Sequence, residues 1–332
     1  MVGRVKIGGD APVSIQSMTK VAASDVRATV AQIRRLEAAG CEIVRVAIKD
    51  LDDAAAVREI RRQVKLPVAC DIHFDHRLAL ACIAAGADKI RLNPGNMKDP
   101  GEVAEVARAA RGAKIPIRVG VNSGSAGGKS PESLVAAARR YIKILEAQNF
   151  HDIIISLKAS DVVSTVEAYR RMASLCDYPL HLGVTAAGPY DGAIVKSSIG
   201  IGGLLLDGIG DTVRVSLTAD PVEEVVAAKR ILGALGLRRF GPDIISCPAC
   251  GRCQVDLVNI VKRFEKALAG DGTDATVAIM GCEVNGPGEA READIGIAAG
   301  KGVGALFVKG KVIRRVKERD FIKELMKEIK KL

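Results

Sequence analysis

Four of the eight cysteines of this 332-residue chain lie in its last quarter. Three form the run Cys247-x2-Cys250-x2-Cys253, and the fourth is Cys282. Two residues between successive cysteines let thiolates converge on one cluster, which is typical of iron–sulfur proteins, whereas zinc sites more often use two separated pairs. We expect no disulfide framework, because the chain is long and begins without the pattern of a signal peptide, which predicts a cytoplasmic location. The spacing therefore predicts a metal centre and favours iron–sulfur.

The composition narrows the class of partner. A formal net charge of +10 favours acidic partners, but aromatic residues make up only 3% of the chain and Trp is absent, so the stacking surfaces of single-stranded nucleic-acid binders are missing. We expect an anionic small molecule or an acidic protein, no nucleic acid, and no membrane span. The basic stretch from Lys309 to Lys331 alternates with acidic residues and predicts an amphipathic terminal helix with a solvated face.

Short β-branched runs alternate with amphipathic helical segments along most of the chain. Eight such runs are Ser14–Met18, Ile43–Ile48, Val68–Ile72, Lys89–Leu92, Ile117–Val121, Ile153–Leu157, His181–Thr185 and Thr212–Leu217. Eight consecutive strand–helix units predict a (β/α)8 TIM barrel. A doubly wound open sheet is the alternative, although its Gly-x-Gly-x-x-Gly turn is absent. The pattern changes near residue 240, so we expect the barrel at 1–240 and a small α+β domain carrying the metal centre at 241–332.

Cationic side chains recur at positions that would place them on the same face of these strands. Side chains alternate along a strand, so in Ile43–Ile48 the valines share one face while Arg45 lies on the other. The same phase holds Arg45, Asp71, His73, Arg91, Arg118, Asn122, Ser156, Lys158, Arg214 and Ser216. Too few carboxylates share this phase to pair with all the cations. Guanidinium groups match phosphate oxygens, so we expect these side chains to surround an anionic ligand at the carboxyl ends of the strands.

The histidines carry less information. His73 shares its face with Asp71 just past the third strand. Two roles are open for it: proton transfer or substrate binding, and a purely structural hydrogen bond. We expect His181 to be structural or solvent-facing.

Several motifs, in order along the whole chain, resemble the 4-hydroxy-3-methylbut-2-enyl diphosphate synthase family. They include Gln16-Ser17-Met18-Thr19, Asp71-Ile72-His73-Phe74, Arg91-Leu92-Asn93-Pro94-Gly95-Asn96, His181-Leu182-Gly183-Val184-Thr185, Cys247-Pro248-x-Cys250 and Gly281-Cys282-x-Val284-Asn285-Gly286-Pro287-Gly288-Glu289. The resemblance is to the compact two-domain bacterial form. The two cysteine-containing motifs are the most specific of the set.

The resemblance implies a reductive ring opening and dehydration of 2-C-methylerythritol 2,4-cyclodiphosphate, with electrons entering through a [4Fe–4S] cluster. It implies cluster ligands Cys247, Cys250, Cys282 and Glu289, and diphosphate contacts from Arg45, Arg91, Arg118, Lys158, Arg214 and Ser216. Asp71, His73, Asn122 and Asn285 match family positions near the substrate carbons. A head-to-tail homodimer and ferredoxin or flavodoxin as electron donor are also implied.

Two positions depart from the family pattern. Ala186 stands where the family usually has Glu, at the mouth of the seventh strand, and Lys20-Val21-Ala22-Ala23 replaces a usual Asn-Thr-Asp-Thr. Spacing alone favours Cys253 as the fourth cluster ligand, whereas the resemblance selects Glu289. Two other functions remain as alternatives: an iron–sulfur electron carrier or sensor, and a zinc-stabilised phosphosugar lyase or isomerase.

Overall fold

The computed structural model describes all residues of 1–332 except 125–127, 129, 269–271, 284–287 and 289. The chain forms two compact units, Met1–Arg238 and Arg239–Leu332. No helix among the described residues is long and apolar enough to cross a bilayer.

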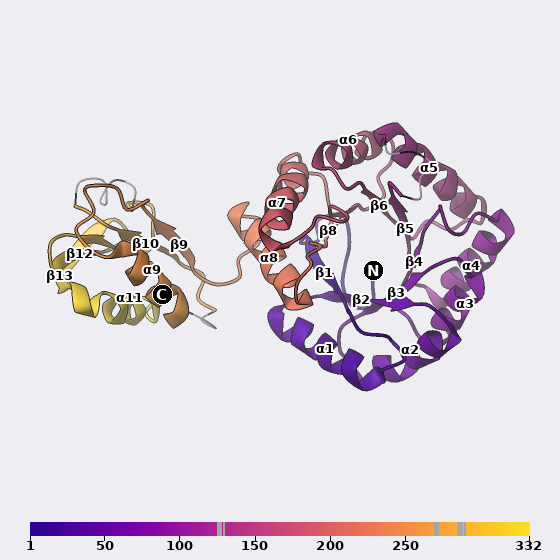
Figure 1. The fold of residues 1–332 in the computed structure, drawn as a ribbon, viewed down its shortest axis with the longest axis horizontal. Coiled ribbons are helices and arrows are strands. Elements are labelled where there is room, and N and C mark those ends of the chain that lie inside the picture. The colour runs from indigo at the N-terminus through magenta and orange to yellow at the C-terminus, as the bar shows by residue number, and fades with distance from the viewer. Residues whose placement is uncertain (125–127, 129, 269–271, 284–287, 289) are drawn as a thin grey trace. The chain divides into compact units, whose positions relative to one another are not determined.

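The first unit is built on an eight-stranded parallel sheet in the order β6-β5-β4-β3-β2-β1-β8-β7. A bridge between Ile155 and Leu180 joins β6 to β7 and completes the ring (Figure 1). The strands are β1 Ser14–Met18, β2 Ile43–Ile48, β3 Val68–Ile72, β4 Lys89–Leu92, β5 Ile117–Asn122, β6 Ile153–Lys158, β7 His181–Leu182 and β8 Thr212–Val213. The predicted (β/α)8 barrel is confirmed, and the open doubly wound sheet is excluded.

A helix follows each strand, and the eight form the outer layer in Figure 1. They are α1 Val26–Ala39, α2 Leu51–Gln63, α3 His76–Ala84, α4 Pro100–Ala113, α5 Pro131–Ala147, α6 Val162–Ala173, α7 Tyr190–Leu206 and α8 Pro221–Ala234. Most begin at a side-chain cap, as at Asp25, Asp161 and Asp220, each of which accepts a hydrogen bond from a first-turn N–H. Such caps are typically worth ~1 kcal/mol and fix where the helix starts after each loop.

The apolar core of the barrel lies between the strands and the helices, where Val46, Ile72, Leu92 and Val119 are fully or almost fully buried. The inner face of the ring is mostly polar, apart from one small cluster of apolar side chains. In this cluster Val2 packs on Ile43, Ala69 and Ile154. Val2 belongs to the N-terminal segment, which lies over the centre of the ring in Figure 1. The polar interior leaves the strands' inner face available for binding chemistry.

Strands β7 and β8 are shorter than the sequence pattern predicts. Both leave the ladder after two residues. The Leu217 N–H, for example, donates to the Glu224 carboxylate instead of to a neighbouring strand. A side chain from α8 thus takes over a hydrogen bond that continued strand pairing would have supplied.

The second unit is a five-stranded mixed sheet in the order β13-β12-β11-β10-β9, and helices accompany it, so it is an α+β fold. Its elements are β9 Asp243–Ser246, α9 Leu257–Ala267, β10 Thr276–Met280, β11 Ile295–Ala299, β12 Val303–Val308, β13 Lys311–Lys317 and α11 Phe321–Ile329. Strands β9, β10 and β11 are parallel, whereas β12 and β13 run antiparallel. Phe264, Ile297, Leu306 and Phe321 lie in its core.

The prediction of one amphipathic helix over the terminal basic stretch is wrong in its first part. Lys311–Lys317 forms the edge strand β13, paired with β12, and the helix begins only at Phe321. Pairing with the exposed edge of β12 decides the conformation there, because local charge alternation fits a solvated strand as well as a solvated helix.

Candidate functional site

The cations predicted from strand phase do share the inner face of the barrel. In the strand register Arg91 lies beside Arg118, Asp71 lies beside Arg91, and Asn122 lies beside Lys158. Neighbouring residues in a parallel register point to the same side of the sheet. Arg91, Arg118 and Lys158 are almost completely buried. The geometry therefore gathers these charges inside one ring.

Asp71 lies at the centre of the cation cluster. Its Oδ1 is 2.9 Å from Arg91 Nη1, and its Oδ2 is 3.5 Å from Arg45 Nε. Burial alone would raise the pKa of this carboxyl, but the charges of Arg45 and Arg91 hold the pKa well below its usual range. His73 Nε2 lies 3.8 Å from Asp71 Oδ2, and His73 Nδ1 contacts the Asn96 amide at 3.1 Å. Asp71 is thus an ionised carboxylate that fixes two guanidinium groups.

The interior carries more positive than negative charge. Among the described residues, the inner face holds the cations Arg45, Lys89, Arg91, Arg118, Lys158 and Arg214, which face the carboxylates of Asp71 and Glu224. Within the described part of the chain, Lys89, Arg118 and Lys158 form no ion pair. Burial, and then the charges of Arg118 and Arg214, lower the pKa of Lys158 well below its usual range. Such an excess of buried charge is costly unless an anion balances it.

Two of the interior residues were missed by the sequence analysis. Lys89 is fully buried and donates from Nζ to Gln16 Oε1 at 2.7 Å, and it is two residues before Arg91, so strand alternation could have found it. Glu224 comes from helix α8 and contacts Arg214 Nη2 at 3.1 Å. No strand periodicity points to Glu224, because it reaches the site from outside the ring.

Arg214 and Ser216 follow β8 and are held together at the barrel mouth. Arg214 Nη1 donates to Ser216 Oγ, while its Nη2 faces Glu224. Both residues thus lie at the barrel mouth, and the protein fixes the guanidinium from two sides.

Two left-handed residues mark the rim. Phe74, next to His73, has φ +65° and is 72% exposed, and Ala186, after β7, has φ +49° and is also exposed. Non-glycine residues in this region cost of order 1–3 kcal/mol and cluster at functional sites. A cavity of about 580 Å³ opens beside His73 and Phe74, lined also by Lys49, Asp50 and Leu78. No carboxylate stands at Ala186 itself.

His181 is fully buried inside the barrel, so of the two alternatives expected for it the solvent-facing one is wrong and the structural one fits. Burial, and then the charges of Lys158 and Arg118, lower its pKa well below the usual range, which keeps the imidazole neutral. Both of its ring nitrogens are buried without a partner among the described atoms, as are Ser14 Oγ and Thr212 Oγ1 on the adjacent strands. Buried polar groups of this kind are commonly satisfied by internal water.

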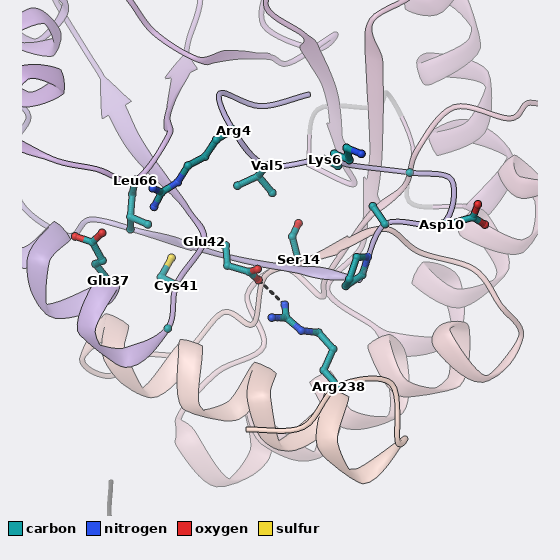
Figure 2. Close-up of a pocket in the computed structure, with 14 residues that line it drawn as sticks. Arg4, Val5, Lys6, Asp10, Ser14, Glu37, Cys41, Glu42, Leu66 and Arg238 are labelled. Atoms are coloured by element: carbon teal, nitrogen blue, oxygen red, sulfur yellow. Dashed lines mark hydrogen bonds and ion pairs between the residues drawn. The ribbon is translucent and has the colours of Figure 1, made fainter. Parts of the chain in front are cut away.

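A separate cavity of about 880 Å³ opens at the other end of the barrel, where the strands begin (Figure 2). Ser14, Glu42 and Leu66 line it, and the Glu42 carboxylate pairs there with Arg238 Nη1 at 2.6 Å. Its mixed charges include Glu37 and Asp10 and do not converge on one point in Figure 2. Because barrel enzymes bind substrates at the carboxyl ends of their strands, we place the candidate site at the cation cluster instead.

Two cysteines of the second unit lie at the ends of two adjacent parallel strands. Cys247 follows β9 and Cys282 follows β10, and the Gly281 N–H donates to Cys247 Sγ at 3.3 Å. Cys250 is exposed, and hydrogen bonds from Arg252, first from its backbone, lower the pKa of the Cys250 thiol. Thiolates with backbone N–H···S bonds are the donor set of iron–sulfur clusters.

Cys253 differs from the other three thiols. Its Sγ donates to the Val255 carbonyl at 3.2 Å and lies against Gly281. No group of three His, Cys, Asp or Glu side chains within the described ranges is arranged to hold a metal ion. Asn285 and Glu289 lie outside the described residues.

Comparison with known proteins agrees with both units. A family model described as the GcpE TIM-barrel domain matches residues 1–229, and one described as the GcpE protein C-terminal domain matches residues 243–331. The 4-hydroxy-3-methylbut-2-en-1-yl diphosphate synthase (flavodoxin) of Thermodesulfovibrio yellowstonii is 53% identical over 338 residues, covering 99% of this chain and 97% of the relative. That of Clostridium perfringens is 52% identical over 337 residues, covering 99% and 96%.

Solved structures resemble the barrel at low identity. Dihydropteroate synthase of Yersinia pestis matches with a TM-score of 0.52 at 12% identity, over 70% of this chain and 98% of that one. The spore coat polysaccharide biosynthesis protein spsE of Bacillus subtilis matches with a TM-score of 0.51 at 11% identity, over 72% and 74%. These likenesses concern the fold alone. The matches to both units, with about half of all residues identical along the whole length, show that the chain belongs to the GcpE family, as its motifs predicted.

Proposed function

We propose that this chain is a 4-hydroxy-3-methylbut-2-enyl diphosphate synthase. It opens the ring of 2-C-methyl-D-erythritol 2,4-cyclodiphosphate by reductive dehydration, a step of isoprenoid biosynthesis. Two observations support the proposal. Relatives of this name match the chain over its full length at 53% and 52% identity, and the barrel holds a cluster of cations with too few carboxylates to balance it. A cyclic diphosphate supplies the negative charge that this cluster lacks.

The barrel residues bind and orient the substrate in this proposal. Arg118 and Lys158, which lack carboxylate partners in the described structure, bind the diphosphate together with Arg45, Arg91, Arg214 and Ser216. Asp71 fixes Arg45 and Arg91 and so sets the geometry of the cluster. Asn122, at the end of β5, lies beside Lys158 in the register and faces the same space.

Proton movement falls to groups at the rim. His73 lies 3.8 Å from Asp71 and its side chain is part-exposed, so it is placed to contact both the substrate and solvent as an acid or a base. Asn285 belongs to the same proposal through its position in the family motif. Ala186 contributes no acid or base at the mouth of β7, in contrast to the usual Glu of the family.

We propose that Cys247, Cys250, Cys282 and Glu289 hold a [4Fe–4S] cluster. Such a cluster, when bound, supplies electrons and a Lewis-acidic iron for C–O bond cleavage. The thiols of Cys247 and Cys282 fit this role because they follow adjacent strands and a backbone N–H already reaches Cys247 Sγ. The family motif selects Glu289 in place of Cys253, whose thiol donates to the Val255 carbonyl at 3.2 Å.

The electron donor is a flavodoxin in this proposal, as in the names of the relatives, with ferredoxin as the other acidic carrier that a basic protein suits. We propose a reducing, cytoplasmic setting, in which thiolate ligands of a cluster persist. We also propose a head-to-tail homodimer, on the resemblance alone.

One anaerobic purification tests the function against its alternatives. We expect about four irons per chain, a broad absorption at roughly 410 nm, and turnover of the cyclodiphosphate with reduced flavodoxin. A colourless zinc protein would point to the lyase or isomerase, and an iron–sulfur protein without turnover would point to a carrier or sensor.

A pair of variants tests the ligand set. Cys253→Ser should keep its iron and most of its activity, whereas Glu289→Ala should lose activity and release iron readily. Loss of iron in Cys253→Ser together with full activity in Glu289→Ala would reverse the assignment. Cys176→Ser, in a half-buried thiol of the barrel, is the matched control and should retain both.

A further inference from the structure

Helix α8 places one carboxylate, that of Glu224, inside the wall of the barrel. Glu224 is 1% exposed and lies in the first turn of α8. Four donors surround its two oxygens: Arg214 Nη2 at 3.1 Å, the Leu217 N–H at 3.2 Å and Lys20 Nζ at 3.4 Å from Oε1, and Ser17 Oγ at 3.0 Å from Oε2. A buried carboxylate with this many donors is fixed in both position and charge.

The carboxylate lies where the first and last strands of the barrel separate. In the described structure, strands β1 and β8 pair at Ser14 with Thr212 and at Ile15 with Val213. Beyond these pairs, Glu224 links β1 to the segment after β8, because it contacts Ser17 on one side and Arg214 on the other. Figure 1 shows α8 outside this pair of strands. Past the two paired positions, a side chain therefore connects β1 to the segment after β8.

This arrangement orients the Arg214 guanidinium. Nη2 faces Glu224 and Nη1 donates to Ser216, while Nε has no partner among the described atoms. Glu224 Oε1 also lies between two cations, Arg214 and Lys20. Without its negative charge, these cations would repel each other and the guanidinium would lose its fixed plane.

We propose that Glu224 is a positioning residue of the diphosphate site, which acts through Arg214. It holds the guanidinium in the orientation that a phosphate group can accept, and through Lys20 it ties the loop after β1 to the same carboxylate. The inference rests on the proposed function, because it takes the ligand of Arg214 to be the diphosphate.

The test is Glu224→Gln in the cluster-containing enzyme. Glutamine keeps the size and one acceptor oxygen but removes the charge. We expect KM for the cyclodiphosphate to rise about tenfold, the effect of one charge-assisted hydrogen bond, with kcat changed by less than about threefold. An unchanged or lowered KM would overturn the inference.

The barrel offers a matched control at its other end. Glu42 also pairs with an arginine, Arg238 at 2.6 Å (Figure 2). It accepts a β1 backbone N–H as well, that of Ile15 at 2.8 Å. Glu42→Gln changes the same chemistry away from the cation cluster and should leave KM unaltered. A rise in KM equal to that of Glu224→Gln would mean that both act through barrel stability, against the inference.

A double-mutant cycle with Arg214→Met shows whether Glu224 acts through Arg214. Glu224→Gln should have no further effect on KM in the Arg214→Met background, whereas additive effects would contradict the inference. If Glu224→Gln does not fold, Ser17→Ala removes one bond to the same carboxylate; KM should rise twofold or more, and only when Arg214 is present. If Arg214→Met itself leaves substrate binding unchanged, the diphosphate assignment fails instead.

Discussion

Replacing Lys158 with Met should make the enzyme more stable and unable to bind its substrate well. Lys158 is 6% exposed at the end of β6, and the described residues offer it no carboxylate. Methionine has nearly the same length without the charge. The substitution therefore removes the cost of holding an ammonium group beside Arg118 and Arg214, at the expense of a contact to the diphosphate.

The two effects have different sizes. Relief of buried, unbalanced charge at a functional site is worth about 1–2 kcal/mol, which in a unit the size of Met1–Arg238 raises the thermal midpoint by about 2–8 °C. Loss of a desolvated charge contact to phosphate costs about 2–5 kcal/mol, so the dissociation constant should rise roughly 30-fold to several thousandfold.

Thermal unfolding without substrate and calorimetric titration with the cyclodiphosphate, both on the anaerobic holoenzyme, measure these effects. Lys229→Met is the control, because Lys229 is a part-buried lysine on helix α8 outside the ring. A lower thermal midpoint for Lys158→Met, or a substrate affinity within about threefold of the parent, would refute the idea that these cations are kept unpaired in order to bind an anionic ligand.

Three other predictions follow from the site. Arg118→Met should weaken cyclodiphosphate binding by roughly 30-fold or more while iron content stays unchanged, as titration and iron analysis will show; unaltered affinity would remove Arg118 from the site. Ala186→Glu should raise kcat by about 10²-fold, with little change in KM, if a carboxylate at the mouth of β7 assists proton transfer; no gain would mean that Asp71 or His73 already supplies it. Because the pKa of Lys158 is lowered on folding, the unfolded chain binds more protons between that pKa and about 10.4, so the free energy of unfolding should rise with pH in this window. Substrate affinity, which needs the ammonium form, should fall over the same window, and titrations at several pH values that show no such fall would contradict the role of Lys158.

Local patterns in the sequence were sufficient for the barrel and for most of its cations. The alternation of side chains along a strand is set by the backbone itself, so Arg45, Arg91 and Arg118 could be assigned to one face without knowledge of the fold. The same rule would have found Lys89, two residues before Arg91. The cysteine spacing and the family motifs were equally readable, because both are contiguous in the chain.

The tertiary structure decided which groups compensate one another. Asp71 pairs with two arginines from different strands, and Glu224 reaches Arg214 from a helix outside the ring, which no periodicity in either segment indicates. The conformation of Lys311–Lys317 likewise depends on β12, a strand that offers its edge only once the sheet has formed. The sequence alone determined the fold, the family and the residues that carry charge, since these depend on local order along the chain. The pairing of those charges, and hence which cations remain for a ligand, was decided by contacts between distant segments, because the energy of a buried charge depends on what lies beside it in space.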